Sequence, residues 1–527
     1  MRIIIRYAED LSLEEKRTLY DYLYRNLKEQ ILNGYFACGE RLPSLNELCE
    51  MYHVGIRTAK DVIRALKEEG LIKTEERKPS YVTYCRPQCT PDTYLVQSVL
   101  KGRTSILQVY RTMELLLPAI YTFSLEVCSS DMQKLCFAQL YKDSRKDLRT
   151  RWKSASLSLY RLLDASGNLL FRDVLTHLEL YARIPFFLEQ EQEECFSFPY
   201  TQYGNPMWIV DAAGTGNPSA IHQQFRSMYA SLTRSVEMYL ADTCSRHPSA
   251  AEEREDMFHW HIQPGRDHYY MQITRSLIDQ IGLGLYGDGD FLPPEAVLAE
   301  QYKVSVSTIR KAIAMLNKTG FCQTYNVKGT QVTLFNDNAT MRCMKNKVFK
   351  RDTLTYLSGL QFMAIAVRPA ALLAFEQIDA GRLEELSLAL KAPYAIPLDL
   401  LIRCVMECLP LQPYRAILNE VTGTLRWGYY YSFFSAGIQA DNPLDRISMS
   451  ACQSLIRGDK EAFAIQLSQC YCHILEFVRD FLADCGLPEA RNFVTPRPEL
   501  LGWEAFGPGP SEPGLPESEL PEPGLPE

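Results

Sequence analysis

Basic and hydroxyl side chains collect on two segments whose apolar residues recur at helical spacing. In the first segment Arg57, Lys60 and Arg64 lie three or four residues apart, on the side of a helix away from Val62 and Leu66. The second segment has no acidic residue, and its polar side chains are Ser307, Thr308, Arg310 and Lys311. Cations and hydroxyls on one helix face are the groups that contact phosphates and base edges. The two segments therefore predict nucleic-acid recognition rather than catalysis.

The sequence lacks the motifs of the common enzyme classes. It has no phosphate-binding P-loop, no Gly-x-Gly-x-x-Gly after a strand and no Gly-x-Ser-x-Gly nucleophile turn. The 16 cysteines are spread along the chain without a Cys-x-x-Cys pair. We therefore expect no enzyme activity, no metal and no other cofactor, and we expect reduced, mostly buried thiols.

Length and charge limit the remaining classes of protein. The chain has 527 residues, too many for one core, and its 56 basic and 64 acidic residues give a net charge of −8. Because the whole chain is acidic, contact with nucleic acid has to come from local basic patches. No stretch reaches the roughly 18 apolar residues of a membrane span, since Arg368 and Pro369 interrupt the best candidate. We expect a cytoplasmic protein without a membrane partner.

A long internal repeat positions the two basic segments. Leu42-Pro43 matches Leu292-Pro293, and Val54, Thr58 and Gly70 match Val304, Thr308 and Gly320, always 250 residues apart. The register holds over about sixty residues without a gap, which indicates a duplicated unit.

Each copy predicts three helices followed by a hairpin. In copy 1 the second helix begins with a capping box of Ser44 and Glu47, and Gly70 ends the third helix. In copy 2 Ser305 is the expected N-cap of the third helix. This element order predicts a winged helix-turn-helix, in which the third helix enters the major groove and the hairpin, or wing, touches the flanking backbone.

The repeated pattern resembles the GntR family of bacterial transcription regulators. Copy 2 carries the family's Leu-Pro motif, its Val304-Ser305 before the recognition helix, and its wing as Lys328-Gly329-Thr330-Gln331-Val332. Copy 1 carries Leu42-Pro43-Ser44 and a shorter match in the wing. Asn46 and Ala296 stand where the family often has arginine, so we expect a different operator.

The resemblance implies a set of residues that contact DNA. They come from the second helix, the recognition helix and the wing of each copy. In copy 1 they are Ser44, Asn46, Arg57, Thr58, Lys60, Arg64, Arg77 and Lys78, and in copy 2 they are Ser305, Ser307, Thr308, Arg310, Lys311, Lys328, Gly329 and Thr330.

The segments after each copy resemble the all-helical sensor domain of the fatty-acid-responsive GntR subfamily. Ala165-Ser166-Gly167-Asn168 matches a turn of that domain. Metal-holding members carry an Asp-x-x-x-His pair and two later histidines. The pair positions are Ala155 and Leu159 in the first half and Asp399 and Arg403 in the second half, and the later positions align to Ser448 and Cys470. The resemblance therefore implies a small-molecule effector, at an unassigned site, without a metal. The acidic, Pro-rich residues 497–527 predict a disordered tail.

The expected fold is mainly α, with two winged helix-turn-helix domains each followed by an all-helical bundle. The predicted boundaries are 13–84 and 265–335 for the winged domains, and 90–250 and 340–487 for the helical domains. We expect a transcription regulator that binds an operator in double-stranded DNA, either as a pseudo-dimeric monomer or as a homodimer. The alternative is an interaction or scaffold protein that kept the winged-helix fold with one or both DNA-binding units inactive, and acidic residues near the copy 1 wing leave this open.

Overall fold

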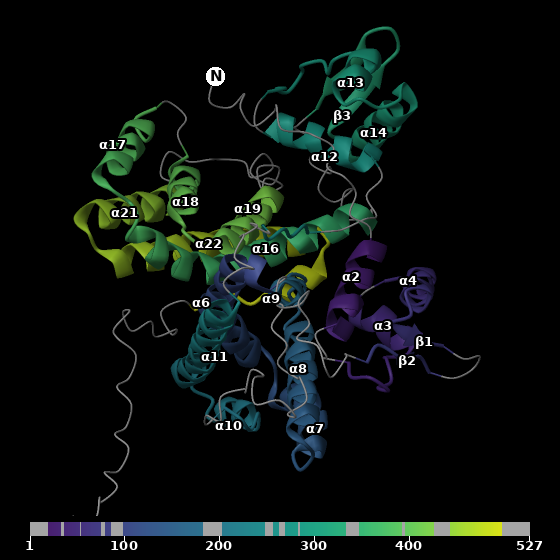
Figure 1. The fold of residues 1–527 in the computed structure, drawn as a ribbon. Coiled ribbons are helices and arrows are strands. Elements are labelled where there is room, and N and C mark those ends of the chain that lie inside the picture. Colours follow the sequence, from purple (N-terminus) through teal and green to yellow (C-terminus); the bar gives the residue numbers. More distant parts are fainter. Residues whose placement is uncertain are drawn as a thin grey trace, which may run out of the picture.

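The computed structural model describes residues 19–32, 36–52, 54–74, 79–85, 99–182, 203–247, 257–262, 269–282, 285–333, 347–392, 396–425 and 443–497. Two small winged-helix units alternate with two larger helical domains along the chain, so that each unit is followed by a helical domain (Figure 1). The mainly α architecture expected from the sequence is confirmed.

Winged-helix unit 1, residues 19–85, is built from three helices and a short hairpin. Its elements are α2 (Leu19–Leu32), α3 (Leu45–Tyr52), α4 (Ile56–Glu68), β1 (Ile72–Lys73) and β2 (Tyr81–Val82). The strands pair antiparallel, with Ile72 opposite Val82. Leu27, Leu48, Val62 and Leu66 are fully buried where the three helices meet, as the helical spacing predicts.

Winged-helix unit 2, residues 269–333, repeats this element order. It consists of α12 (Tyr269–Gly282), α13 (Glu295–Gln301), α14 (Val306–Thr319), β3 (Cys322–Tyr325) and β4 (Gly329–Val332). Its two strands have four residues each, with Cys322 opposite Val332 and Tyr325 opposite Gly329. The two units have the same topology, which is what the 250-residue repeat predicts.

The predicted helix ends are also found. The Ser44 N–H donates to the Glu47 carboxylate (2.6 Å) and the Glu47 N–H donates to Ser44 Oγ (3.3 Å), which is the capping box. Ser305 Oγ caps α14 by accepting from the Thr308 N–H. Gly70 (φ +75°) and Gly320 (φ +87°) end the third helices in the left-handed conformation that favours glycine.

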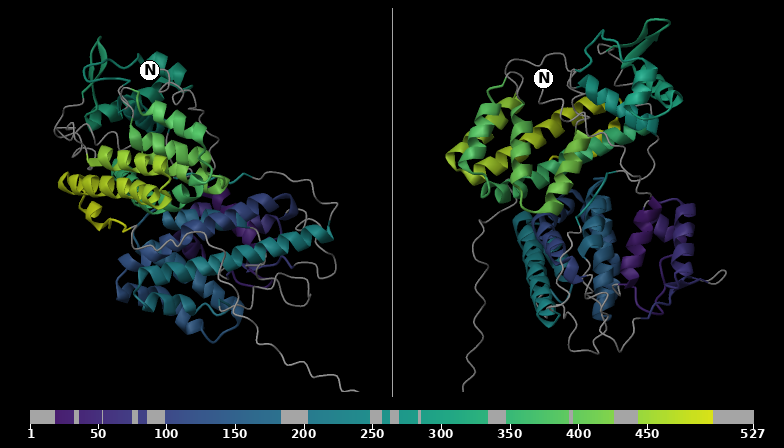
Figure 2. Two further views of the ribbon diagram at one scale, coloured as in Figure 1. Left: turned by 90° about the vertical axis from the view of Figure 1, so that its left-hand side faces the viewer. Right: turned by 45° about the horizontal axis from the view of Figure 1, so that its top comes forward.

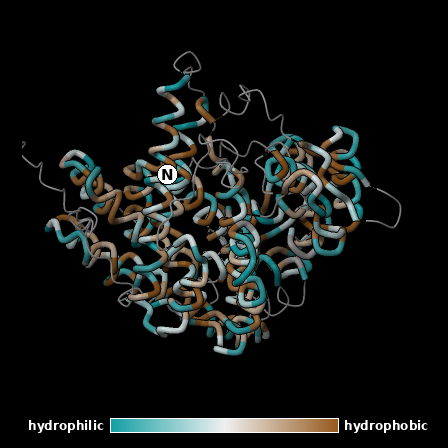
Figure 3. Tube along the Cα trace, turned by 60° about the horizontal axis from the view of Figure 1, so that its bottom comes forward, coloured by the Kyte–Doolittle hydropathy of each residue, from teal (hydrophilic) through white to brown (hydrophobic). Residues whose placement is uncertain are grey.

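Helical domain 1, residues 99–247, is a bundle around two long helices. It contains α6 (Arg103–Val127), α7 (Ser130–Asp143), α8 (Leu148–Ala165), α9 (Phe171–Ala182), α10 (Trp208–Gly214) and α11 (Pro218–Arg246). The helices α6 and α11 pack along each other, and α9 packs on α6. Apolar and polar stretches alternate along the helices in Figure 3, as expected for amphipathic helices around a shared core.

Helical domain 2, residues 347–497, has the same plan. Its elements are α16 (Lys347–Phe375), α17 (Ala380–Ala389), α18 (Pro397–Cys408), α19 (Gln412–Leu425), α21 (Pro443–Arg457), α22 (Lys460–Asp484) and the 3₁₀ helix η2 (Pro488–Asn492). The long pair is now α16 and α22. Pro118 in α6 and Pro369 in α16 both lie inside the first long helix of their domain, so the duplication extends beyond the winged-helix units.

The two helical domains pack directly on each other. Helix α6 contacts both α16 and α19 (Figure 1). Buried Asn168, in the turn before α9, donates from Nδ2 to the Ser358 carbonyl and to Gln361 Oε1, both at 2.9 Å, on α16. The rings of Phe171 and Phe362 lie 6.2 Å apart across the same interface. A buried polar bridge inside an apolar contact fixes how the two domains align.

The winged-helix units attach to the helical domains differently. Unit 2 shares one continuous hydrophobic core with both helical domains, whereas the core of unit 1 is separate. In unit 2, Arg275 of α12 forms a two-pronged ion pair with buried Asp352 of α16, at 2.8 and 3.1 Å. The matching Arg25 of unit 1 lies over the Tyr181 ring of α9 instead. Among the described residues, unit 1 therefore contacts helical domain 1 through an ion pair, Glu40 with Lys153, and through cation–π contacts.

Two expectations from the sequence need correction. Within the described residues, Phe349–Phe375 is long and apolar enough to cross a membrane, although 94% of its most apolar window is buried in the protein. Arg368 and Pro369 do not interrupt this helix, because Arg368 is buried and pairs with Glu461 (3.3 Å) and because the helix continues through the proline. The expectation of reduced thiols throughout is wrong for Cys38 and Cys85, which form a disulfide.

Candidate nucleic-acid interface

Helix α4 of unit 1 buries one face and exposes a basic one. Its buried residues are Ala59, Val62, Ile63 and Leu66, which hold the helix against α2 and α3. Arg57, Lys60 and Arg64 are exposed on the remaining surface, and Thr58 is half-buried. The helix is thus presented with its cations toward solvent, in the orientation that groove entry requires.

Helix α14 of unit 2 has the same division of faces. Ile309, Ala312, Ile313 and Leu316 are buried. Ser305, Ser307, Arg310 and Lys311 are exposed, while Thr308 is half-buried. The Ser305 hydroxyl lies 2.9 Å from both Ser307 Oγ and Thr308 Oγ1, so three hydroxyls cluster at the start of the helix. Hydroxyls and backbone N–H groups at a helix start are suited to a phosphate.

Two carboxylates that the sequence reasoning overlooked lie beside these cations. Arg64 pairs with Asp61 of the same helix at 2.6 Å, and Arg310 pairs with Glu295 of α13 at 2.7 Å. Both pairs are solvent-exposed and therefore weak. The i,i+3 spacing of Asp61 and Arg64 was a usable signal, whereas the Glu295 contact depends on tertiary structure.

The recognition helices differ in net charge. Helix α4 has four basic and two acidic residues, and α14 has three basic residues and none acidic. Within the described part of the chain, Arg57, Lys60 and Lys311 form no ion pair. Asp61 stands at the repeat position of Lys311, so the same place on the helix surface has opposite charge in the two units.

The second helices offer fewer groups than expected. Asn46 of α3 is exposed, but the matching Ala296 of α13 has no polar group. Ser44 is half-buried, and its hydroxyl and N–H are both used in the capping box. Its role in the structure is therefore helix capping.

The wing of unit 2 displays Lys328 and Gly329 at its exposed tip. Thr330 requires a correction, since it is only 8% exposed and its Oγ1 lies 3.0 Å from Thr324 Oγ1 across the hairpin. Its side chain stabilises the wing and is not presented to a ligand. Val327, which the sequence reasoning passed over, is fully exposed at the tip with φ +70°. Arg77 and Lys78, the predicted wing contacts of unit 1, lie outside the described residues.

Both units lie on one side of the molecule. They occupy the right-hand side of Figure 1, and they stay on that side in the tilted view of Figure 2. The recognition helices α4 and α14 therefore lie on the same side of the molecule.

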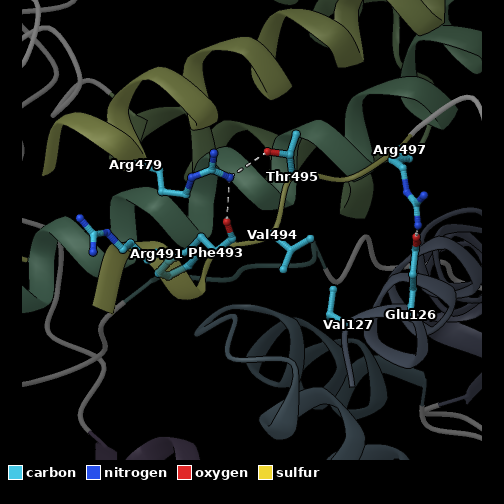
Figure 4. A pocket seen from close by; sticks show the side chains of 8 residues that line it. All are labelled: Glu126, Val127, Arg479, Arg491, Phe493, Val494, Thr495 and Arg497. Atoms are coloured by element: carbon cyan, nitrogen blue, oxygen red, sulfur yellow. Dashed lines mark hydrogen bonds and ion pairs between the residues drawn. The ribbon is translucent and has the colours of Figure 1, made fainter. Parts of the chain in front are cut away.

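A pocket of about 580 Å³ lies where the two helical domains meet, lined by the end of α6, by α22 and by the segment after it (Figure 4). Arg479 donates to the Phe493 carbonyl and to Thr495 Oγ1, both at 3.2 Å, and Arg497 pairs with Glu126 across the domain boundary. Arg491 is exposed beside them. Three arginines and one glutamate line the pocket, which contacts both halves of the repeat. Each arginine has a carboxylate partner: Glu126 for Arg497, Asp480 for Arg479 (2.9 Å) and Asp484 for Arg491 (3.7 Å).

No group of three or more His, Cys, Asp or Glu side chains arranged to hold a metal ion occurs among the residues that the structure describes. At the second-half positions that match the Asp and His of related sensors, Asp399 is exposed and Arg403 is half-buried. The other matching positions, Ala155, Leu159, Ser448 and Cys470, are all buried. Ser448 Oγ donates to the Leu444 carbonyl within α21. These side chains serve packing and helix hydrogen bonding.

Parts of the chain are similar to known proteins. The family model described as "Bacterial regulatory proteins, gntR family" matches residues 19–82 and 269–332. An HTH-type transcriptional regulator of Bacillus subtilis, YdhC, is 26% identical over 93 residues, which span 18% of this chain and 41% of the relative. The solved structures of Streptococcus agalactiae GntR (17% identity, TM-score 0.20) and E. coli McbR/YncC (16%, 0.21) each align with 41% of this chain and with 99% and 98% of their own.

The two matched segments coincide with the two winged-helix units, each with its recognition helix and wing. Each of the two winged-helix units of this chain is therefore similar to the bacterial regulatory proteins of the gntR family, and the two similar segments stand in tandem.

Proposed function

We propose that the protein is a cytoplasmic, sequence-specific transcription regulator that binds an operator as a pseudo-dimer within one chain. The observation that carries the proposal is the exposure of two basic recognition helices on one side of a molecule whose helical domains pack together. Winged-helix regulators that act as dimers bind two half-sites, one with each subunit, and here one chain supplies both winged-helix units. Once one unit is bound, covalent linkage raises the effective concentration of the other unit at its half-site, to about the millimolar range for short linkers.

The two half-sites should differ in sequence. Arg57 and Asp61 of α4 stand where α14 has Ser307 and Lys311. Arginine favours guanine edges and serine discriminates less, so equal half-sites would not satisfy both helices. We therefore propose an asymmetric operator.

Selection of bound duplexes from a random pool tests this proposal. The full chain should enrich one site with two unequal halves, and light scattering should give one chain per duplex. Binding of that site should weaken as salt rises. Lys60→Ala and Lys311→Ala should each weaken binding, while Lys142→Ala, an exposed lysine on α7, should have no effect.

A failure to enrich any site would favour the alternative of an interaction protein. Enrichment of a single half-site whose binding depends on Lys311 but not on Lys60 would show that only unit 2 binds DNA, and this would refute the pseudo-dimer.

We further propose that a small anionic effector controls the protein through the helical domains. The arginine-lined pocket at their junction supports this, because its arginines can exchange their carboxylate partners for an anionic ligand and because a ligand there touches both α6 and α22. Such a ligand can change the spacing of the DNA-binding units only if it binds two arrangements with different affinity. A thermal-shift screen of small carboxylates and phosphates should find stabilising compounds whose effect is lost in Arg491→Ala and kept in Arg246→Ala. A screen without any such compound would count against this site.

A further inference from the structure

Unit 1 contains a pair of cysteines placed for reversible oxidation. Cys38 precedes α3 and Cys85 follows β2, and their Cα atoms are 4.9 Å apart although 47 residues separate them in sequence. That distance lies within the usual range for a disulfide. Both residues are exposed, so reductants and oxidants can reach the bond.

The backbone brings the two cysteines together without help from the crosslink. The Gly39 N–H donates to the Val82 carbonyl (2.8 Å) and the Val82 N–H donates to the Glu40 carbonyl (2.9 Å). Unit 2 forms the same ladder, with Gly289 to Val332 at 3.0 Å and Val332 to Asp290 at 2.8 Å. Asp288 and Phe335 occupy the repeat positions of Cys38 and Cys85. The fold therefore does not require the disulfide, and unit 2 is a natural comparison without it.

The other thiols are less accessible. Every free cysteine in the described part of the chain is buried or half-buried. Burial raises the pKa of Cys322 in unit 2 and of Cys470 in α22 to about 12, which suppresses the reactive thiolate. Reaction with a soluble oxidant should therefore favour the exposed pair.

The pair lies next to the contact between unit 1 and helical domain 1. Glu40, two residues after Cys38, pairs with Lys153 of α8. Phe36, two residues before Cys38, lies under the same lysine, with Nζ 5.4 Å from the ring centroid. A crosslink at Cys38 thus stiffens the segment through which unit 1 touches its helical domain.

We propose that Cys38 and Cys85 form a reversible thiol–disulfide switch that controls unit 1 in response to low-molecular-weight disulfides such as oxidised glutathione. The thiolate of one cysteine attacks a sulfur of the small disulfide, whose S–S bond breaks and releases one thiolate. The second cysteine, as its thiolate, then attacks the protein sulfur of the mixed disulfide and releases the second small thiolate. The two protein thiols are oxidised, one small disulfide is reduced to two thiols, and the two protons pass to the released thiolates.

Mass spectrometry on the full chain tests the chemistry. The protein is equilibrated in graded ratios of reduced to oxidised glutathione, blocked with an alkylating agent and digested. The expected result is a crosslinked Cys38–Cys85 peptide pair that appears and disappears reversibly with the ratio. Cys38→Ser should abolish the pair and Cys49→Ser should keep it. Alkylation of both cysteines at every ratio, crosslinking of Cys38 to Cys89 instead, or a bond that no ratio reduces would each overturn the switch.

The effect on DNA rests on the proposed function and is measured separately. Because the crosslink preorganises the base of the wing, the oxidised full chain should bind the selected operator at least about threefold more tightly than the reduced chain. Cys38→Ser and Cys85→Ser should respond equally little to glutathione. A reversible crosslink with unchanged DNA affinity would refute the control of unit 1. Absence of DNA binding in both states would refute the proposed function, and the peptide analysis would still decide whether the thiols switch.

Discussion

Replacement of Asp61 by asparagine should strengthen DNA binding through unit 1. Asp61 is the acidic residue next to the basic face of α4, it accepts from Arg64 at 2.6 Å, and Lys311 stands at its place in unit 2. Asp61→Asn removes the charge that repels phosphate and releases the Arg64 guanidinium. The Arg64–Asp61 pair is exposed, with 68% and 37% of the two side chains accessible, so its loss should change stability by less than about 1 kcal/mol.

The size of the effect follows from counterion release. Each phosphate neutralised by a cation adds about −0.9 to the slope of log K against log salt. If Arg64 gains one phosphate contact, a fourfold increase in salt weakens binding by about a further threefold relative to the unmodified chain. At low salt the variant should bind more tightly, by an amount that shrinks as salt rises.

Fluorescence anisotropy with the selected operator, between roughly 50 and 200 mM salt, measures this slope. Lys311→Ala is the matched control in unit 2, and it should make the negative slope less steep by about 0.9. The double variant Asp61→Asn, Arg64→Ala should return to the original slope if Arg64 makes the new contact. An Asp61→Asn slope equal to that of the unmodified chain, alongside a reduced slope for Lys311→Ala, would show that α4 does not lie against DNA.

Three further predictions concern the stability of the folded chain. Arg275→Met should lower the stability of the chain by about 2 kcal/mol or more, because it leaves Asp352 buried without its two-pronged partner. The matching Arg25→Met removes only a cation–π contact and should cost less than about 1 kcal/mol. Equal shifts of the thermal unfolding midpoint in the two variants would contradict this. Asn168→Ala should cost about 1–3 kcal/mol, because it removes two buried hydrogen bonds and leaves Gln361 Oε1 on α16 without this donor; a melting curve like that of the unmodified protein would refute the bridge. Burial, with two nearby arginines, lowers the pKa of His222 to about 4 from 6.5, so the unfolded chain binds the extra proton. Stability should therefore fall by up to about 3 kcal/mol as pH drops from 6.5 to 4, and His222→Phe should flatten that part of the pH profile.

The sequence predicted the winged-helix units well because their signals are local. Helical spacing, the Ser44–Glu47 capping box and the left-handed glycines after each third helix depend on residues close in the chain. The repeat supplied the element order twice, which made the register secure.

What the sequence did not reveal depends on contacts between distant segments. The Cys38–Cys85 disulfide joins residues that only the ladder between the segment before α3 and β2 brings together. From the sequence, Thr330 was predicted to contact DNA from the wing, but strand alternation turns its side chain to the buried face beside Thr324. The packing of α6 on α16 and α19 follows from neither periodicity nor a motif, since apolar helices of this length can pack against many partners.

Fusion of two copies into one chain removes the constraint that symmetry places on a homodimer. In a homodimer each substitution appears on both subunits, so a contact at the interface must suit both sides of the two-fold axis. Here Arg275 pairs with Asp352 while Arg25 stacks on Tyr181, and Lys311 stands in one copy where Asp61 stands in the other. The same freedom allows unit 1 to carry the Cys38–Cys85 pair while unit 2 has no cysteine at the two repeat positions. On the proposed function, a signal acting on unit 1 changes one half of the operator contact and leaves the other half intact, whereas in a symmetric dimer of identical chains the same thiol pair is present in both halves.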